Sequence, residues 1–369
     1  SLLFESGIIK RRGRITAKNT VSDYFPVEQE YGYSVFSTVY HVEWNGKKLN
    51  IIDCPGSDDF VGAAITALNV TDTAILLLNG QYGPEVGTQN HFRYTEKLGK
   101  PVIFLVNQLD NEKCDYDNVL EQLRSIYGSK VVPVQYPLET GPNFHELIDV
   151  LLMKKYSWGP EGGAPTIEEI PDSEREKALE MHKALVEAAA ENDETLMEKF
   201  FEDPDSITVD ELKAALRKAV CDNKIVPVCC GTAFKNKGVQ LLLNNVVDYM
   251  PSPVDVKAIE GELEDGTKTE RHSSDDEPFS ALSFKVMTDP FVGRLTFLRV
   301  YSGVITSGSY VLNSTNGKKE RISRLVRMYA DQRLEENEVY AGDICAAVGL
   351  KDTTTGDTLC DETAPIVLE

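Results

Sequence analysis

The sequence lacks three features that would each define a class of protein. Its cysteines are odd in number, seven, and none forms a CxxC pair, which argues against a disulfide framework and against a zinc site. We expect reduced, mostly buried thiols. No apolar run reaches the roughly 18 residues that a membrane span needs, and the N-terminus has no secretory signal pattern. We therefore expect a cytoplasmic protein.

Positive charge is also scarce. Lys and Arg number 38 against 59 Asp and Glu, and the formal net charge is -21. Because Lys and Arg make the contacts to phosphates, this balance disfavours a general nucleic-acid coat. Basic residues gather only locally, at Lys10 to Arg14 and at Lys318, Lys319, Arg321, Arg324 and Arg327. If Glu320 to Met328 is one strand, its side chains alternate between two faces, so only part of the second basic group can lie on one face. A solvated strand face is then the simpler interpretation of these residues.

The length and the pattern of apolar runs indicate an α/β domain in a chain of two or three domains. The chain has 369 residues, with 41% hydrophobic and 26% charged, which is ordinary for a globular protein. Strands are predicted at Leu49 to Asp53, Ala74 to Leu78 and Val102 to Val106, with helices at Val61 to Leu68 and Val86 to Leu98. This alternation predicts βαβ units and a mostly parallel sheet.

Segments before and after these units have their own patterns. Val35 to Trp44 alternates as a strand, and Asn45-Gly46 is a strong hairpin signal. Residues 144–153 look helical. The pattern is also helical from Asp172 to about Val220, where Thr208-Val209-Asp210-Glu211 is a capping box. We interpret that region as a helical insertion, although a solvated charged face explains its exterior equally well.

The last third of the chain changes in character. A strand at Ile225 to Cys230 and a helix at Val239 to Met250 end at Pro251-Ser252-Pro253, and short strands separated by glycine turns follow from Pro278 onward. These strands suggest a small β-barrel. The predicted division is a first domain over 1–253 with an inserted subdomain at about 138–222, a polar, acidic linker over 254–276, and an all-β domain over 277–369.

The stretch from Asp53 to Gly56, Asp-Cys-Pro-Gly, follows a predicted buried strand. In open α/β sheets, ligands bind at the carboxyl edge, where such a strand ends. The pattern suits a nucleoside triphosphate: Asp53 would approach Mg²⁺ through water, and Gly56 would let its N–H reach the γ-phosphate without a side chain in the way. The alternative is a strand that ends in a solvated turn.

Two further polar clusters follow predicted strands. In Asn107-Gln108-Leu109-Asp110, the Asp carboxylate can accept from N1–H and N2–H₂ of guanine while the Asn amide ties neighbouring loops together. The alternative is an Asn/Asp turn. The small-residue turn Gly231-Thr232-Ala233 can place backbone N–H groups against a purine carbonyl.

In this order, with Pro251-Ser252-Pro253 and the β-barrel behind them, these motifs resemble those of translational GTPases, most closely bacterial elongation factor G. The resemblance covers essentially the whole chain and implies GTP and Mg²⁺ as cofactors. It assigns Asp53 and Ser34 to the Mg²⁺ site, Gly56 to the γ-phosphate, Asn107 and Asp110 to the guanine, and Gly231, Thr232 and Ala233 to the third base contact. Ser34 lies in Gly32-Tyr33-Ser34, where the family usually has Gly-Ile-Thr, and Tyr31 stands where an Arg is usual.

The sequence departs from the family pattern in two places that matter for chemistry. No G-x-x-x-x-G-K-[ST] phosphate-binding loop occurs in the chain. Ser1 to Gly7 reads as the last turns of a helix ended by a Gly cap and resembles the helix that follows that loop, so we expect a truncated chain that binds GTP poorly. Ser57 occupies the place of the family's catalytic His, which predicts weak or absent ribosome-stimulated hydrolysis. The alternative is that Asp58, Asp59 or a bridging water substitutes.

The resemblance implies a monomeric, elongation factor G-like translation factor that binds GTP and the ribosome, through rRNA and ribosomal proteins, and promotes translocation with weakened hydrolysis. One alternative is a translocation GTPase that hydrolyses at a normal rate. Another is a non-hydrolysing ribosome-protection or stalled-ribosome factor that acts by occupancy alone, like the tetracycline-resistance relatives.

Overall fold

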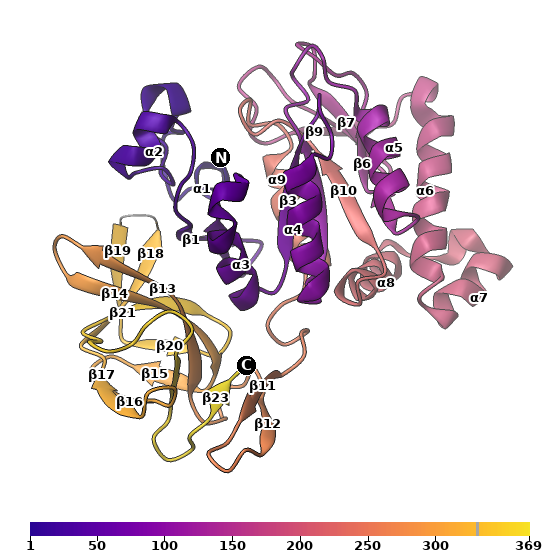
Figure 1. Ribbon diagram of the computed structural model, residues 1–369. Helices are drawn as coiled ribbons and strands as arrows, with labels where there is room; N and C mark the ends of the chain where they lie inside the picture. The colour runs from indigo at the N-terminus through magenta and orange to yellow at the C-terminus, as the bar shows by residue number, and fades with distance from the viewer. Residues whose placement is uncertain (330–331) are drawn as a thin grey trace. The chain divides into compact units, whose positions relative to one another are not determined.

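The computed structural model describes residues 1–329 and 332–369 (Figure 1). The chain forms two compact units, each built from several segments. The first unit comprises Ser1–Arg12, Glu43–Lys47 and Asp72–Pro251, and the second comprises Gly13–Val42, Lys48–Thr71 and Ser252–Glu369. The domain limits drawn from the sequence stay a prediction.

A four-stranded parallel sheet forms the centre of the first unit. Its strands are β3 (Ala74–Asn79), β4 (Val102–Asn107), β10 (Val226–Cys230) and β5 (Val131–Pro133), in that order. Every neighbouring pair is parallel. The strands are nearly continuous apolar runs because a parallel sheet is covered on both faces. The prediction of a parallel α/β domain is confirmed.

Helices α4 (Val86–Lys97), α5 (Tyr116–Tyr127) and α9 (Val239–Tyr249) belong to this α/β domain, and Figure 1 shows α4 in front of β3. The first and last were predicted almost to their ends. Helix α5 was not predicted. Its N-cap is Asp115, whose carboxylate accepts from the Asn118 N–H at 3.1 Å, and it buries Tyr116, Val119, Leu120 and Leu123.

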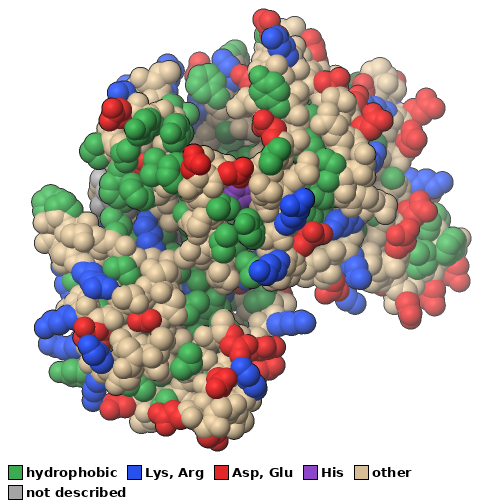
Figure 2. Space-filling model, viewed as in Figure 1, with side chains coloured by type: hydrophobic (Ala, Val, Ile, Leu, Met, Phe, Trp, Pro, Cys, Tyr) green, Lys and Arg blue, Asp and Glu red, His purple; other side chains and the backbone are tan. Residues whose placement is uncertain are grey.

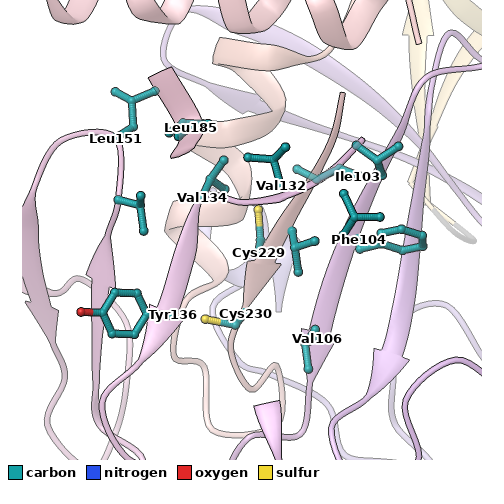
Figure 3. Close-up of a cluster of buried hydrophobic side chains, with 14 of the residues drawn as sticks. Ile103, Phe104, Val106, Val132, Val134, Tyr136, Leu151, Leu185, Cys229 and Cys230 are labelled. Carbon is teal, nitrogen blue, oxygen red and sulfur yellow. The ribbon is translucent and has the colours of Figure 1, made fainter. Parts of the chain in front are cut away.

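The core of the first unit is built on β4, β10 and the strand that starts at Val131. Figure 3 shows Ile103, Phe104 and Val106 beside Val132, Val134, Cys229 and Cys230. Leu185 of α6 (Arg175–Ala190) packs into the same core. All seven cysteines are free thiols and five are buried, as the sequence predicts: Cys114, Cys229, Cys230, Cys345 and Cys360.

An antiparallel sheet precedes the helices of the insertion. Its strands run in chain order: β6 (Gln135–Pro137), β7 (Glu146–Asp149), β8 (Lys154–Ser157) and β9 (Thr166–Glu169). The prediction of a helix over 144–153 is wrong, because β7 pairs on both sides with extended neighbours. The Asp149 carboxylate then accepts from the N–H groups of Leu151 and Leu152, which makes a turn there rather than a helix.

Three helices follow this sheet, and the helical prediction for that region is confirmed. They are α6, α7 (Glu194–Glu202) and α8 (Val209–Cys221). The capping box is present: the Thr208 hydroxyl accepts from the Glu211 N–H, and the Glu211 carboxylate accepts from the Thr208 N–H. Figure 2 shows acidic and basic side chains interspersed over α6 and α7, so the exterior is a mixed charged surface.

The second unit is mainly an eight-stranded antiparallel sheet, which confirms the predicted all-β fold of the C-terminal part. In sheet order its strands are β17 (Lys318–Arg321), β16 (Tyr310–Asn313), β22 (Thr358–Cys360), β13 (Ser280–Asp289), β14 (Gly293–Ser302), β21 (Ile344–Val348), β18 (Arg324–Tyr329) and β19 (Gln332–Glu336). β15 (Val304–Thr306) pairs with β20 (Glu338–Tyr340).

Two details of this unit differ from the sequence pattern. Residues 320–328 were taken as one strand, but β17 and β18 are separate: Ser323 donates its N–H to Val348 O, and its neighbour Ile322 donates to Ser309 O.

The polar segment expected to be a linker contains β11 (Ile259–Glu262) and β12 (Lys268–Arg271), which pair with each other, and β11 also pairs with β23 (Val367–Leu368). The sequence analysis missed these strands because their charged side chains are mostly exposed, so the apolar alternation typical of a strand is absent.

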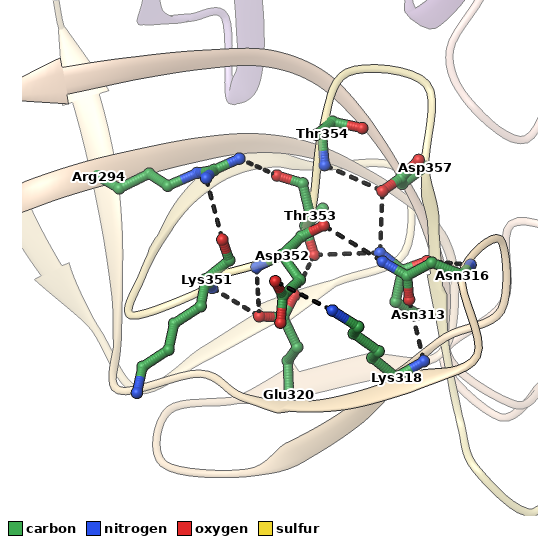
Figure 4. A network of polar contacts seen from close by, with 10 residues as sticks. All are labelled: Arg294, Asn313, Asn316, Lys318, Glu320, Lys351, Asp352, Thr353, Thr354 and Asp357. Carbon is green, nitrogen blue, oxygen red and sulfur yellow. Dashed lines mark hydrogen bonds and ion pairs between the residues drawn. The ribbon is translucent and has the colours of Figure 1, made fainter.

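A buried polar network fixes one loop of the β domain (Figure 4). Glu320 is 6% exposed, and its carboxylate accepts from the Asp352 N–H at 2.9 Å and from the Thr353 hydroxyl. Asn313 donates its amide to Asp357 at 3.0 Å. Buried polar groups must be hydrogen-bonded to avoid a desolvation cost, so these side chains fix the path of residues 351–357.

The hairpin predicted at Asn45-Gly46 is present, with φ of 48° and 73° at its two turn residues. It joins β1 (Thr38–Trp44) to β2 (Lys47–Asp53) in a two-stranded sheet of their own. The expectation that the strand ending at Asp53 lies in the parallel sheet is therefore wrong. A two-residue turn closes this pairing at little entropic cost, whereas a parallel pairing needs a long crossover.

No helix in the described part of the chain is long and apolar enough to cross a membrane.

Candidate guanine nucleotide site

The loops after β4 and β10 lie side by side in the first unit, because the two strands are neighbours in the parallel sheet. Backbone bonds join them: Gly231 donates to Val106 O at 3.0 Å, and Leu109 donates to Gly231 O at 3.3 Å. Leu109 is fully buried in the core of the first unit and anchors its loop there. The carboxyl edge of the sheet thus carries both of the clusters that the sequence singled out.

Two side-chain bonds connect these clusters directly. The Thr232 hydroxyl donates to Asp110 Oδ1 at 2.7 Å, and the Ala233 N–H donates to Asn107 Oδ1 at 3.0 Å. Thr232 is 1% exposed. The structure therefore brings together all five residues predicted to contact the base: Asn107, Asp110, Gly231, Thr232 and Ala233. Their role in binding remains a prediction.

Glycine is required by close packing around these loops. A Cβ on Gly231 would lie 2.6 Å from Lys237 O, and a Cβ on Gly80 would lie 2.5 Å from Cys114 Sγ and 2.9 Å from Asn107 O. Gly80 also donates its N–H to Asn107 O at 2.9 Å. The sequence did not single out Gly80, although its position just after strand β3 was a usable signal.

A buried lysine supports the turn after β10. Lys237 exchanges backbone bonds with Thr232, and its Nζ donates to Phe144 O at 2.9 Å. Burial lowers the pKa of Lys237, the nearby charge of Lys235 lowers it further, and Asp110 opposes the shift. The sequence analysis missed this residue because a lysine seven positions after a strand carries no distinctive local pattern.

The remaining predicted site residues lie in the second unit. Ser34 donates its hydroxyl to Asp23 Oδ1 at 2.6 Å. Burial raises the pKa of Asp53 to about 6; a hydrogen bond from Ser22 opposes this shift, and the charges of Asp23 and Glu28 add to it. Asp23 thus lies close to both predicted Mg²⁺ ligands. The structure brings Ser34 and Asp53 to the same acidic neighbourhood.

Glu28, which the sequence analysis did not select, organises the segment that carries Ser34. It lies on α2 (Pro26–Tyr31), is fully buried, and accepts from the N–H groups of Val35 at 3.1 Å and Phe36 at 3.0 Å. Phe25 donates to the same carboxylate at 3.4 Å. One buried carboxylate therefore satisfies three backbone donors of a segment that has little regular structure.

Ser57 and Gly56 are in open surroundings. Ser57 caps the short 3₁₀ helix Asp58–Phe60, with its Oγ accepting from the Asp59 N–H at 3.4 Å. A Cβ on Gly56 would meet no atom within 4 Å. A side-chain cap is a structural use of Ser57 that needs no catalytic role.

The donor sets fit the nucleotide that the sequence predicts. One oxygen of Asp110 accepts from Thr232, and a carboxylate has about four lone-pair sites, so the two oxygens together are still able to take the two N–H groups of guanine. Ser34 and Asp53 present hard oxygen ligands, which suit Mg²⁺. No group of three or more His, Cys, Asp or Glu residues in the described ranges could hold a metal ion.

Comparison with known proteins agrees with this geometry. Residues 1–252 match the family described as Elongation factor Tu GTP binding domain, and residues 293–360 match Elongation factor Tu domain 2. A crystal structure of a protein from Thermus thermophilus is similar, with a TM-score of 0.86 and 30% sequence identity. The similarity covers 99% of this chain and 52% of that protein, so the chain spans about half the length of that relative.

The parallel sheet with its paired polar loops, followed by an antiparallel β domain, is the arrangement of a translation-factor GTP-binding domain and the second domain that follows it. The chain belongs to the family of the Elongation factor Tu GTP binding domain. A region that matches Elongation factor Tu domain 2 follows this domain in the sequence.

Proposed function

We propose that the protein is an elongation factor G-like translation factor that binds GTP with Mg²⁺, docks on the ribosome and promotes translocation with weakened hydrolysis. The observation that carries the proposal is the cluster of Asn107, Asp110, Thr232 and Ala233 on two adjacent strand ends. The family match over residues 1–252 supports it.

Guanine would be read by a charged acceptor and a backbone turn. The Asp110 carboxylate would accept from the ring N1–H and the exocyclic N2–H₂ of guanine, and bonds to a charged carboxylate are about twice as strong as neutral ones. The Asn107 side chain accepts from the Ala233 N–H and so keeps the turn at Ala233 next to the proposed guanine site. A bound Mg²⁺ would supply positive charge that offsets the negative charge on the phosphates. Ser34 and Asp53 would hold it, in part through water.

Weak hydrolysis follows from the chemistry of Ser57. Phosphoryl transfer needs a group that orients the attacking water. A serine hydroxyl is shorter than an imidazole and carries no positive charge, and the Ser57 Oγ already accepts a backbone bond from Asp59. Asp58 and Asp59 remain candidate substitutes on the same turn.

The ribosome is proposed as partner despite the acidic total charge. The basic side chains of the β domain mostly have acidic neighbours: Lys318 pairs with Asp352 at 3.2 Å, and Lys319 with Glu362 at 2.9 Å. Exposed ion pairs of this kind contribute little to stability. RNA phosphates can therefore exchange with these carboxylates at small cost, which allows local contacts without a basic coat.

A second candidate is a factor that acts by occupancy alone, and the capping role of Ser57 is the observation that favours it. The test is multiple-turnover GTP hydrolysis by the complete protein with and without ribosomes, beside Ser57→His. The proposal expects weak stimulation in the wild type and higher activity in the variant. Strong stimulation of the wild type would mean that another group orients the water, and ribosome binding with no hydrolysis at all would favour occupancy.

A further inference from the structure

An arginine from the N-terminal segment reaches the turn that is proposed to read the base. Arg12 Nη1 donates to Phe234 O at 2.9 Å and to Ala233 O at 3.3 Å. Its guanidinium lies 5.9 Å from the ring centroid of Phe4. Arginine stays charged and stacks on aromatic faces, so Phe4 holds the orientation of this guanidinium while it bonds the two carbonyls.

These bonds determine the orientation of one peptide plane. The Ala233 carbonyl also accepts from the Ser1 hydroxyl at 2.8 Å and from the Asn236 N–H at 3.1 Å. A trans peptide is planar, so its C=O and the next residue's N–H point in opposite directions. The chain has no cis peptide bond in its described part. Fixing the Ala233 carbonyl therefore directs the Phe234 N–H away from Arg12.

We propose that Arg12 is a positioning residue for base recognition. It holds the peptide plane between Ala233 and Phe234, so that the turn presents the Phe234 N–H to the carbonyl at position 6 of guanine. This inference rests on the proposed function, because Asp110 must read the N1–H and N2–H₂ groups of the same base. Arg12 touches no base atom and acts through the turn.

Other side chains brace the same loop without bonding this peptide. Glu5 accepts from the side chains of Asn236 and Gln240. Those side-chain contacts hold the loop in place but do not themselves bond the Ala233 carbonyl. Arg11, the neighbour of Arg12 in the sequence, provides a control with the same charge and nearly the same position.

The test compares two ligands that differ at position 6 alone. GDP and 6-thio-GDP share the N1–H and N2–H₂ donors, but sulfur is a much weaker acceptor than oxygen. Affinities of the complete protein are measured by calorimetry for the wild type, Arg12→Met, Arg12→Lys and Arg11→Met. We expect Arg12→Met to weaken GDP binding roughly three- to tenfold and 6-thio-GDP binding less, so that the preference for oxygen shrinks.

Arg12→Lys should restore part of the preference, and Arg11→Met should leave it at the wild-type value. An equal loss for both ligands in Arg12→Met would show a merely structural brace and would overturn the inference. Asp110→Ala is measured in parallel: if it leaves GDP affinity unchanged, the base site itself is misplaced and the proposed function fails with it. A strong loss in Asp110→Ala together with an unchanged preference in Arg12→Met would overturn the inference alone.

Discussion

Two regions carry the predicted site residues, and the contacts that stabilise each region internally are of different kinds. In the first unit, the loops after β4 and β10 are joined by backbone bonds between adjacent strand ends, and two side chains complete the connection. In the second unit, the segment around Ser34 is held by the buried carboxylate of Glu28 and by the bond from Ser34 to Asp23. The first arrangement is fixed by the sheet, whereas the second depends on side-chain bonds.

This difference matters for function. A base-reading loop must keep its donors and acceptors in place before the ligand arrives, because preorganised groups lose less entropy on binding. The segment around Ser34, whose proposed role is to bind Mg²⁺, is held by side-chain bonds instead. The bond from Ser34 to Asp23 and the bond from Ser22 to Asp53 engage both predicted Mg²⁺ ligands within the protein. The Ser34 hydroxyl keeps its lone pairs while it donates to Asp23, and Asp53 would approach Mg²⁺ through water, so these contacts could persist when Mg²⁺ binds.

The largest effect is expected from Glu28→Ala. The change leaves three partly buried N–H donors without their acceptor, and a fully buried donor left unpaired costs about 1–3 kcal/mol, so each of these costs at most that much. We expect the amides of Val35 and Phe36 to lose hydrogen-exchange protection while those of β4 keep theirs. Glu30→Ala, on the exposed side of the same helix, is the control. Unchanged protection at Val35 and Phe36 would show that the segment does not depend on Glu28.

A pH-dependent effect is expected at Asp149 in the first unit. Burial raises its pKa from 3.8 to about 6, against the bonds from Leu151 and Leu152. The folded state therefore holds a proton that the unfolded state releases, and this contribution to stability is lost as the pH rises from 3.8 to about 6. Asp149→Asn should be more stable than the wild type by roughly 2–3 kcal/mol at about pH 7, with the difference vanishing below about pH 4.

Denaturant unfolding of both proteins across this pH range is the measurement. Asp205→Asn, at an exposed position, should follow the wild type at every pH. Parallel curves for the wild type and Asp149→Asn would contradict the prediction.

A pair of glycine substitutions tests the packing of the two regions. Gly231→Ala places a Cβ 2.6 Å from Lys237 O and should lower the free energy of unfolding by about 1–3 kcal/mol. Gly56→Ala meets no atom within 4 Å and should change it by less than about 0.5 kcal/mol. Thermal or urea unfolding measures both. Equal losses would mean that the base-reading turn is no more tightly packed than the Gly56 loop.

The smallest effect is expected from Ser34→Ala. Removing the hydroxyl deletes one bond to Asp23, a net loss of about 0.5–1.5 kcal/mol. Ser34→Thr keeps a hydroxyl and should retain wild-type stability in urea unfolding. A loss in Ser34→Thr as large as in Ser34→Ala would show that packing, rather than the bond to Asp23, sets the effect.

Local sequence rules predicted the features that a few adjacent residues determine. Asn45-Gly46 requires two positive φ angles and forms the hairpin, and Thr208 with Glu211 forms the capping box. The strand-end clusters at Asn107 and Gly231 were found for the same reason, because an apolar run that stops at polar residues marks the edge of a parallel sheet.

Features that depend on distant residues could not be predicted. Glu28 looks like an ordinary charged helix residue, and only the fold shows that it is buried against backbone donors. Residues 144–153 have a helix-like pattern, yet pairing on both sides of β7 makes them extended. The strand ending at Asp53 pairs with its hairpin neighbour rather than with the parallel sheet, a choice between two pairings that apolar periodicity does not resolve.

The central claim is that the loops after β4 and β10 recognise guanine through Asp110. The most direct test is the affinity of the complete protein for GDP and for xanthosine diphosphate, in the wild type and in Asp110→Asn. Xanthine has a carbonyl where guanine has an amino group, so an amide donor suits it and a carboxylate does not. The account predicts that the wild type prefers GDP by roughly 100-fold or more and that Asp110→Asn reverses the preference. Equal preferences in the two proteins would contradict it.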